Sequence, residues 1–177
     1  LRGHWGDLDS RDVVDVLATV QSSSGFTAST TAVIGASAGG LTALGVAASA
    51  PDKVSACVAV YPVADIASLD DTTHRFEAHY NRSLMGSPSE TVERSLRRSP
   101  MHRITEIARV PVLLMHGDLD PVVPVDQSRR LADALRRAGG EVEFIEFAGE
   151  GHGFRGVDAK RDEIHAMERF LSGHLTG

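Results

Sequence analysis

Cysteine and aromatic side chains are scarce in this chain of 177 residues, which has one cysteine, Cys57, and 5% aromatic residues. A single thiol cannot form an internal disulfide, and the sequence shows no charged leader followed by an apolar segment and a small-residue cleavage site. We therefore expect a cytoplasmic protein. Cys57 itself lies in the apolar run 54–60, where we interpret it as a small buried hydrophobic residue.

Long apolar runs and an excess of positive charge are also absent. The apolar run from Val54 to Ala64 is shorter than the roughly 20 residues of a membrane span, and Pro62 interrupts it. The net charge is −6, and the 18 lysine and arginine residues are scattered apart from a few arginine pairs. Because an acidic chain repels phosphate, we do not expect nucleic acid as a partner. Because no apolar stretch is long enough for a span, we do not expect a membrane as a partner either.

Motifs for metal ions and nucleotides are missing as well. The sequence has no CxxC or HExxH, and His74 and His79 have no third ligand nearby at a suitable spacing. No glycine-rich loop precedes a Lys-Ser or Lys-Thr pair. We therefore predict that the protein uses neither a metal ion nor a cofactor.

The chain does have the composition of one globular domain, with 42% hydrophobic and 24% charged residues. The first expected helix has Asp9 or Ser10 as its N-cap and ends near Ser23-Ser24-Gly25. Apolar periodicity and turn signals predict strands at 31–35, 54–60, 112–115 and 142–147, and further helices at 38–50, 75–80, 89–97, 104–108, 126–138 and 159–171. Strands that alternate with helices indicate an α/β fold with a mainly parallel sheet.

The segment Gly35-Ala36-Ser37-Ala38-Gly39 fits the pattern G-x-S-x-G between a predicted strand and a predicted helix. In this context a nucleophilic serine is held on a tight turn with its hydroxyl above the sheet. The backbone N–H of Ala38, at the start of the helix, would then face the developing oxyanion. The alternative is an ordinary glycine- and serine-rich turn, because matches with three fixed positions are common.

Two carboxylates follow the strand at 112–115, in the turn His116-Gly117-Asp118-Leu119-Asp120. Ligands of open α/β sheets bind at the carboxyl ends of the strands. A carboxylate at such a position can hold a histidine tautomer and stabilise the imidazolium that forms during proton transfer. The alternative is local turn chemistry, which we expect for Asp118.

A histidine between two glycines, His152, follows the strand at 142–147. It completes the chain order Ser, Asp, His that α/β-hydrolase triads follow, and the flanking glycines leave its ring room to move. The sequence therefore predicts Ser37, Asp120 and His152 as a catalytic triad. We expect six other histidines to lie at the surface without a catalytic role: His4, His74, His79, His102, His165 and His174.

With these motifs, the sequence resembles the catalytic domain of the prolyl oligopeptidase family of serine peptidases, particularly its acylaminoacyl-peptidase-like branch. The resemblance runs over nearly all of the chain. It is carried by Trp5-Gly6-Asp7, Gly35 to Gly40, Tyr61-Pro62-Val63, Arg75 to Tyr80, Ser99-Pro100, His116-Gly117 with Asp120, and Gly149 to Phe154. It implies an α/β-hydrolase fold. It also implies that Asp120, four residues after the histidine of the His-Gly turn, is the acid.

The resemblance further implies a pocket for the side chain before the cleaved bond, with Val63 and Val123 in its lining. Proline-selective members have aromatic residues shortly after the segment that matches Tyr61-Pro62-Val63, but 64–73 contains none. Members that release dipeptides commonly have asparagine two positions after the acid, where this chain has Val122. We therefore expect neither strict cleavage after proline nor dipeptide release.

We predict a serine peptidase that hydrolyses short peptides, acylaminoacyl- or aminopeptidase-like, through an acyl-enzyme on Ser37. His152 would act as general base and then as general acid, while Asp120 orients it. A carboxylesterase of the same fold is an alternative, because ester and amide hydrolysis share this machinery. A non-catalytic fragment is the other alternative.

We expect residues 1–177 to be the C-terminal part of a single α/β-hydrolase domain, because only one helix precedes the Ser37 strand and the chain opens at Leu1 without Met. The resemblance implies upstream strands and a β-propeller that this sequence does not contain. The missing N-terminal part of the polypeptide is therefore an expected partner. Without it the strand at 31–35 would expose unpaired backbone, which favours association into homo-oligomers.

Overall fold

A parallel sheet of four strands, in the order β1-β2-β3-β4, forms the centre of the molecule. The computed structural model describes residues 3–72 and 88–176. The strands are β1 (Ala32–Ala36), β2 (Ala56–Val60), β3 (Val112–Gly117) and β4 (Val142–Phe147). Because all strands run in the same direction, their carboxyl ends lie along one edge of the sheet. Loops that carry functional side chains are expected at that edge.

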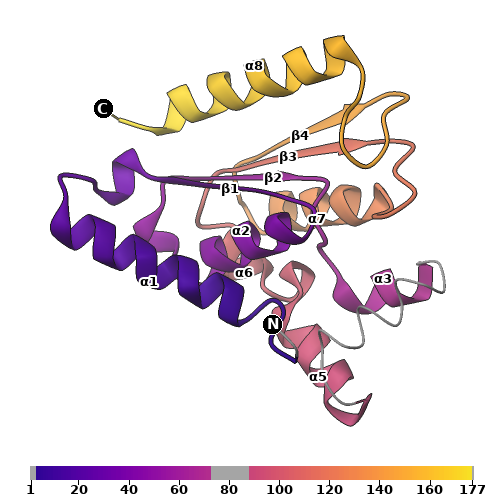
Figure 1. Ribbon diagram of the computed structural model, residues 1–177, viewed down its shortest axis with the longest axis horizontal. Helices are drawn as coiled ribbons and strands as arrows, with labels where there is room; N and C mark the ends of the chain where they lie inside the picture. Colours follow the sequence, from indigo (N-terminus) through magenta and orange to yellow (C-terminus); the bar gives the residue numbers. More distant parts are fainter. Residues whose placement is uncertain (1–2, 73–87, 177) are drawn as a thin grey trace.

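Helices cover both faces of the sheet. Figure 1 shows α8 on one face, with α1, α2, α6 and α7 on the other. The α-helices are α1 (Leu8–Ser23), α2 (Ala38–Ser49), α3 (Ile66–Thr72), α5 (Pro88–Arg98), α6 (Ile104–Ile107), α7 (Asp126–Arg137) and α8 (Val157–His174). Short 3₁₀ turns lie at Ala28–Thr30, Pro51–Lys53 and Pro100–His102. The fold is therefore a layered α/β structure of helix, sheet and helix.

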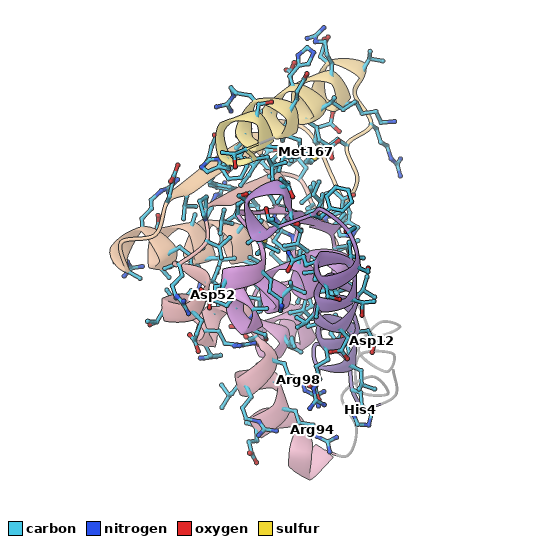
Figure 2. The ribbon with its side chains drawn as sticks, turned by 90° about the vertical axis from the view of Figure 1, so that its left-hand side faces the viewer. His4, Asp12, Asp52, Arg94, Arg98 and Met167 are labelled. Carbon is cyan, nitrogen blue, oxygen red and sulfur yellow. The ribbon has the colours of Figure 1, made fainter. Side chains whose placement is uncertain are left out.

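The two faces of β2 and β3 each pack into their own hydrophobic core, because successive strand residues point to opposite faces. Cys57 and Ala59 lie in the core beneath α2 and α7, whereas Val58 and Val60 lie in the core beneath α8. Met167, labelled in Figure 2 on the inner side of α8, packs against this second core. A strand that is buried on both faces reads as a continuous apolar run, as β2 does.

A partly buried arginine, Arg98, fastens the first described residues to the helix α5. The Nη1 atom of Arg98 donates hydrogen bonds to the carbonyl oxygens of Gly3 and Trp5, at 3.1 and 3.0 Å. Asp7 lies 3.8 Å from the same guanidinium group. Figure 2 shows Arg98 close to His4 at this end of the molecule. The contacts bring Trp5 into a hydrophobic cluster beside the carboxyl ends of the strands, where it is 5% exposed.

The expected α/β fold with a parallel sheet flanked by helices is confirmed, and every predicted strand is present with bounds shifted by at most two residues. The helix α3 and the 3₁₀ turns were not predicted. The helix expected at 75–80 lies outside the described residues. Among the described residues, no helix is both long and apolar enough to cross a membrane.

One edge strand of this sheet, β1, pairs on one side with β2, and its Ile34 is 53% exposed. An exposed apolar residue on an edge strand is a site at which another strand or chain can pair. That a strand from an upstream segment fills this place stays a prediction.

His174 fastens the last turn of α8 to Glu141, the residue before the edge strand β4. Its Nδ1 lies 2.7 Å from the carbonyl oxygen of Phe170, and its Nε2 lies 3.0 Å from Oε1 of Glu141. Burial opposes the charged ring. However, these two hydrogen bonds and the charges of Glu141 and Glu143 together raise the pKa of His174 above its usual 6.5.

A raised pKa stabilises the fold below the unfolded value of 6.5 and loses its effect as the pH rises through the folded value. We therefore expect His174→Gln to lower the stability of the intact protein by about 0.5–1 kcal/mol at pH 6 and by less at pH 9. Thermal unfolding at the two pH values measures this difference. A loss that is equal at both, or larger at pH 9, would contradict the assignment.

Candidate active site

Ser37 lies on a strained turn between β1 and α2. Its backbone has φ +54° and ψ −121°, a conformation that residues with a side chain rarely adopt. The turn is possible because Gly35 has no side chain. A Cβ atom at this position would lie only 2.0 Å from the carbonyl oxygen of Gly39. The N–H of Ser37 donates to the carbonyl of Val60 on β2, at 2.9 Å. The turn therefore lifts the Ser37 hydroxyl above the carboxyl edge of the sheet.

Three loops at this edge bring Ser37, His152 and Asp120 together. The Nε2 atom of His152 lies 2.9 Å from Oγ of Ser37, and its Nδ1 lies 2.7 Å from Oδ2 of Asp120. Because an ionised carboxylate only accepts, Nδ1 carries the hydrogen and Nε2 accepts from the serine hydroxyl. The His152 side chain is 22% exposed, whereas that of Asp120 is fully buried. This arrangement can pass the hydroxyl proton of Ser37 to the imidazole.

Asp120 remains ionised although it is buried. Burial by itself would raise the pKa of Asp120, but hydrogen bonds from His116, His152 and the backbone N–H groups of Val123 and Val122 outweigh it. Together they hold this pKa well below its usual value of 3.8. The backbone bonds are 2.9 Å for Val123 and 2.8 Å for Val122, both to Oδ1. A carboxylate with this many donors keeps its charge and its orientation throughout the neutral range.

The loop after β3 (118–125, here called the acid loop) and the loop after β4 (148–156, the histidine loop) are tied to one another. The N–H of Leu119 donates to the carbonyl of Glu150 at 2.9 Å, and Oδ1 of Asp118 accepts from the N–H of Gly149 at 2.6 Å. The loops approach so closely that a Cβ atom at Gly117 would lie 2.3 Å from the carbonyl oxygen of Glu150. Asp118 therefore acts in the connection between the loops and does not contact His152 in the described structure.

The side chain of Glu150 closes the histidine loop on itself. Its two carboxylate oxygens accept from the N–H groups of Arg155 and Gly156, at 2.7 and 3.0 Å. A loop fixed at both of its ends can hold the ring of His152 between Ser37 and Asp120. Sequence reasoning gave Glu150 no role of its own, because hydrogen bonds to backbone atoms leave no pattern in a single sequence.

His116 is a second residue that sequence reasoning did not single out as part of the site. Its ring is fully buried below Asp120, with Nε2 2.9 Å from the carbonyl of Val123 and 3.3 Å from Oδ2 of Asp120. Its Nδ1 lies 2.7 Å from Oγ of Ser128 on α7. Since a carbonyl only accepts, Nε2 carries a hydrogen. The available signal was a histidine directly after the apolar residues of β3.

The other predicted site residues lie around this triad. Ala38 opens α2, so its backbone N–H belongs to the helix-end groups that have no partner within the helix. Val63 and Val123 lie in a buried cluster with Trp5 and Leu41, and they are 3% and 1% exposed. Their side chains leave almost no surface for a substrate in this arrangement. Their role in substrate binding stays a prediction.

No group of three or more His, Cys, Asp or Glu side chains within 3–72 and 88–176 is placed to hold a metal ion. The geometry described above is of the kind that nucleophilic catalysis by a serine with a histidine base requires. Comparison with known proteins indicates the same kind of chemistry. A family model described as the prolyl oligopeptidase family matches residues 1–177.

The chain belongs to the prolyl oligopeptidase family. It is 30% identical to the acylamino-acid-releasing enzyme of Rattus norvegicus over 99% of this chain and 25% of that enzyme. A solved structure of a puromycin-hydrolysing peptidase from Mycobacterium tuberculosis is 32% identical with a TM-score of 0.92, over 99% of this chain and 26% of that one. Esterase LipC of Mycobacterium tuberculosis is 39% identical over 77 residues, 42% of this chain and 19% of that protein.

These comparisons confirm three predictions: the family, the α/β-hydrolase fold and the assignment to the serine hydrolases. The chain spans about a quarter of the length of the rat enzyme and of the mycobacterial peptidase. The substrates and the activity of the whole protein therefore do not follow from these similarities alone.

The two carboxylates of the acid loop have different contacts: Asp120 binds the ring of His152, and Asp118 accepts from the backbone of Gly149. In the intact protein, Asp120→Asn should lower kcat about 10⁴-fold, because the amide cannot hold the required tautomer of His152. Asp118→Asn should be mild, since the amide oxygen still accepts from the N–H of Gly149. Steady-state kinetics on both variants measures the ranking. The reverse ranking would show that Asp118 is the acid.

Proposed function

We propose that the protein is a serine peptidase that hydrolyses short peptides, with free or acylated N-termini, through an acyl-enzyme on Ser37. The observation that carries the proposal is the unbroken chain of hydrogen bonds from the Ser37 hydroxyl through His152 to Asp120. A serine hydroxyl is a weak nucleophile unless a base takes its proton. Here the base and the group that orients it are both within hydrogen-bonding distance.

In the proposed reaction, Oγ of Ser37 attacks the carbonyl carbon of the scissile bond while its proton passes to Nε2 of His152. The negative charge on the former carbonyl oxygen faces the backbone N–H of Ala38. The tetrahedral intermediate then collapses, the C–N bond breaks, and His152 gives its proton to the leaving amine. Water hydrolyses the acyl-enzyme by the same steps, with His152 again as base and then as acid.

Asp120 does not change its protonation in this scheme. Its pKa is far below neutral, so it remains a carboxylate while His152 alternates between imidazole and imidazolium. The buried charge stabilises the imidazolium that forms when Ser37 attacks. The site therefore separates the two tasks, with proton transfer on His152 and electrostatic support on Asp120.

The relatives support peptides as the substrate class. The rat enzyme is named for the release of acylamino acids, and the mycobacterial structure is described as a puromycin-hydrolysing peptidase. The absence of aromatic residues in 64–73 and the presence of Val122 after the acid favour broad apolar specificity over strict cleavage after proline. We place this activity in the cytoplasm, because the single cysteine offers no internal disulfide.

A carboxylesterase is the second candidate, favoured by the similarity to Esterase LipC over 77 residues. Esters and amides pass through the same tetrahedral intermediate, but an amide needs its leaving nitrogen protonated. Substrates that differ only in the scissile atom therefore separate the two functions.

We expect the intact protein to cleave acetyl-alanyl and alanyl anilides, and the corresponding prolyl anilides with less than about a hundredfold preference. Ser37→Ala should lower kcat on each anilide by about 10⁶-fold, the scale found when the nucleophile of a serine protease is removed. Initial rates on anilides and matched aryl esters measure this. Cleavage of esters without anilides would favour the carboxylesterase, and cleavage of neither would favour a non-catalytic protein.

A further inference from the structure

Two residues other than glycine have a positive φ among the described residues, and both contact His152. They are Ser37, with φ +54°, and Tyr61, with φ +37°. The ring of Tyr61 lies 4.6 Å from that of His152, centroid to centroid, at an interplanar angle of 54°. Ser37 lies on the turn between β1 and α2 and is the nucleophile of the proposed reaction. The strained tyrosine has no part in that mechanism, although a bulky residue rarely adopts this backbone conformation.

The strain at Tyr61 is held by the ends of the neighbouring strands. Tyr61 directly follows β2, and its N–H donates to the carbonyl of Met115 on β3 at 2.6 Å. The next residue, Pro62, packs so tightly on the start of α2 that a Cβ atom at Gly40 would lie 2.7 Å from its Cβ. Val60, on the other side, accepts the N–H of Ser37. Strained residues that their surroundings hold in this way cluster at functional sites.

The ring of Tyr61 fills the space between three parts of the site. It meets the ring of Phe154, at the far end of the histidine loop, edge-on at 5.6 Å and 88°. It also meets the buried ring of His116 at 6.5 Å and 75°. On the remaining side it lies beside His152, with the two rings tilted against each other.

We propose that Tyr61 is a positioning residue for His152, whose ring fixes the plane of the imidazole and stabilises its imidazolium form. The proposal rests on the proposed function, in which His152 becomes charged when Ser37 attacks. A cation within about 6 Å of an aromatic centroid is attracted to the π system, and the attraction grows where water is partly excluded. Because only the charged ring gains this attraction, Tyr61 would favour the transition state over the resting enzyme.

The groups that face this pair are consistent with that role. Asp120 and Ser37 hold the two nitrogens of His152, and the charge of Glu163 on α8 acts on Tyr61. Burial, followed by the charges of Glu163 and Asp120, raises the pKa of Tyr61. The phenol therefore stays neutral when His152 takes up the proton of Ser37 in the proposed reaction. The aromatic face, and not the hydroxyl, carries the proposed effect.

The test compares Tyr61→Phe, which keeps the ring, with Tyr61→Leu and Tyr61→Met, which remove it. The pKa of His152 is read by NMR of the intact protein with ¹³C-labelled histidine, its signal assigned by loss in His152→Ala. We expect that Tyr61→Phe leaves this pKa unchanged, whereas the other two lower it by about half a pH unit to one unit. They should also lower kcat by about tenfold with little change in KM.

Phe154→Leu is the matched control, because the ring of Phe154 contacts those of Tyr61 and Phe147 in the same core but, within the described residues, not that of His152. It should lower the unfolding temperature without moving the pKa of His152. A pKa of His152 that is unchanged in Tyr61→Leu or Tyr61→Met would overturn the proposal, as would an equal shift in Phe154→Leu. The NMR result stands even if the protein cleaves no peptide, so failure of the proposed function remains distinguishable.

Discussion

The buried carboxylate of Asp120 is the constraint on which the rest of the site depends. An ionised group away from water is stable only when hydrogen bonds satisfy it, and here the donors are the side chains of His116 and His152 and two backbone N–H groups of its own loop. His116 anchors the carboxylate to β3 from below, and His152 joins it to the histidine loop. Removing one donor would leave part of the buried carboxylate unsatisfied, which costs free energy and weakens the support for His152.

The parallel sheet supplies the second constraint, because it brings the ends of β1, β2, β3 and β4 to one edge. Each strand end contributes one part: Ser37 after β1, Tyr61 after β2, Asp120 after β3 and His152 after β4. Their side chains meet although they come from loops far apart in the sequence. The close approach of the loops at Gly117 keeps Asp120 and His152 next to one another.

Much of this arrangement could be predicted from the sequence because it depends on local patterns. The G-x-S-x-G turn, the apolar runs of the buried strands and the order of Ser37, Asp120 and His152 are such patterns. The positive φ of Tyr61, the hydrogen bond between His116 and Asp120 and the burial of Val63 are not, because each results from contacts between distant segments. For α3 the seven residues of the helix were too few for a clear period.

The central claim is that His152, held by Asp120, makes Ser37 a nucleophile. It is tested most directly by treating the intact protein with a fluorophosphonate and locating the adduct by tandem mass spectrometry of the digested protein. The account predicts an adduct on Ser37 that forms readily in the natural protein and is lost in a folded His152→Ala variant. An adduct on another residue, or equal labelling of Ser37 without His152, would contradict it.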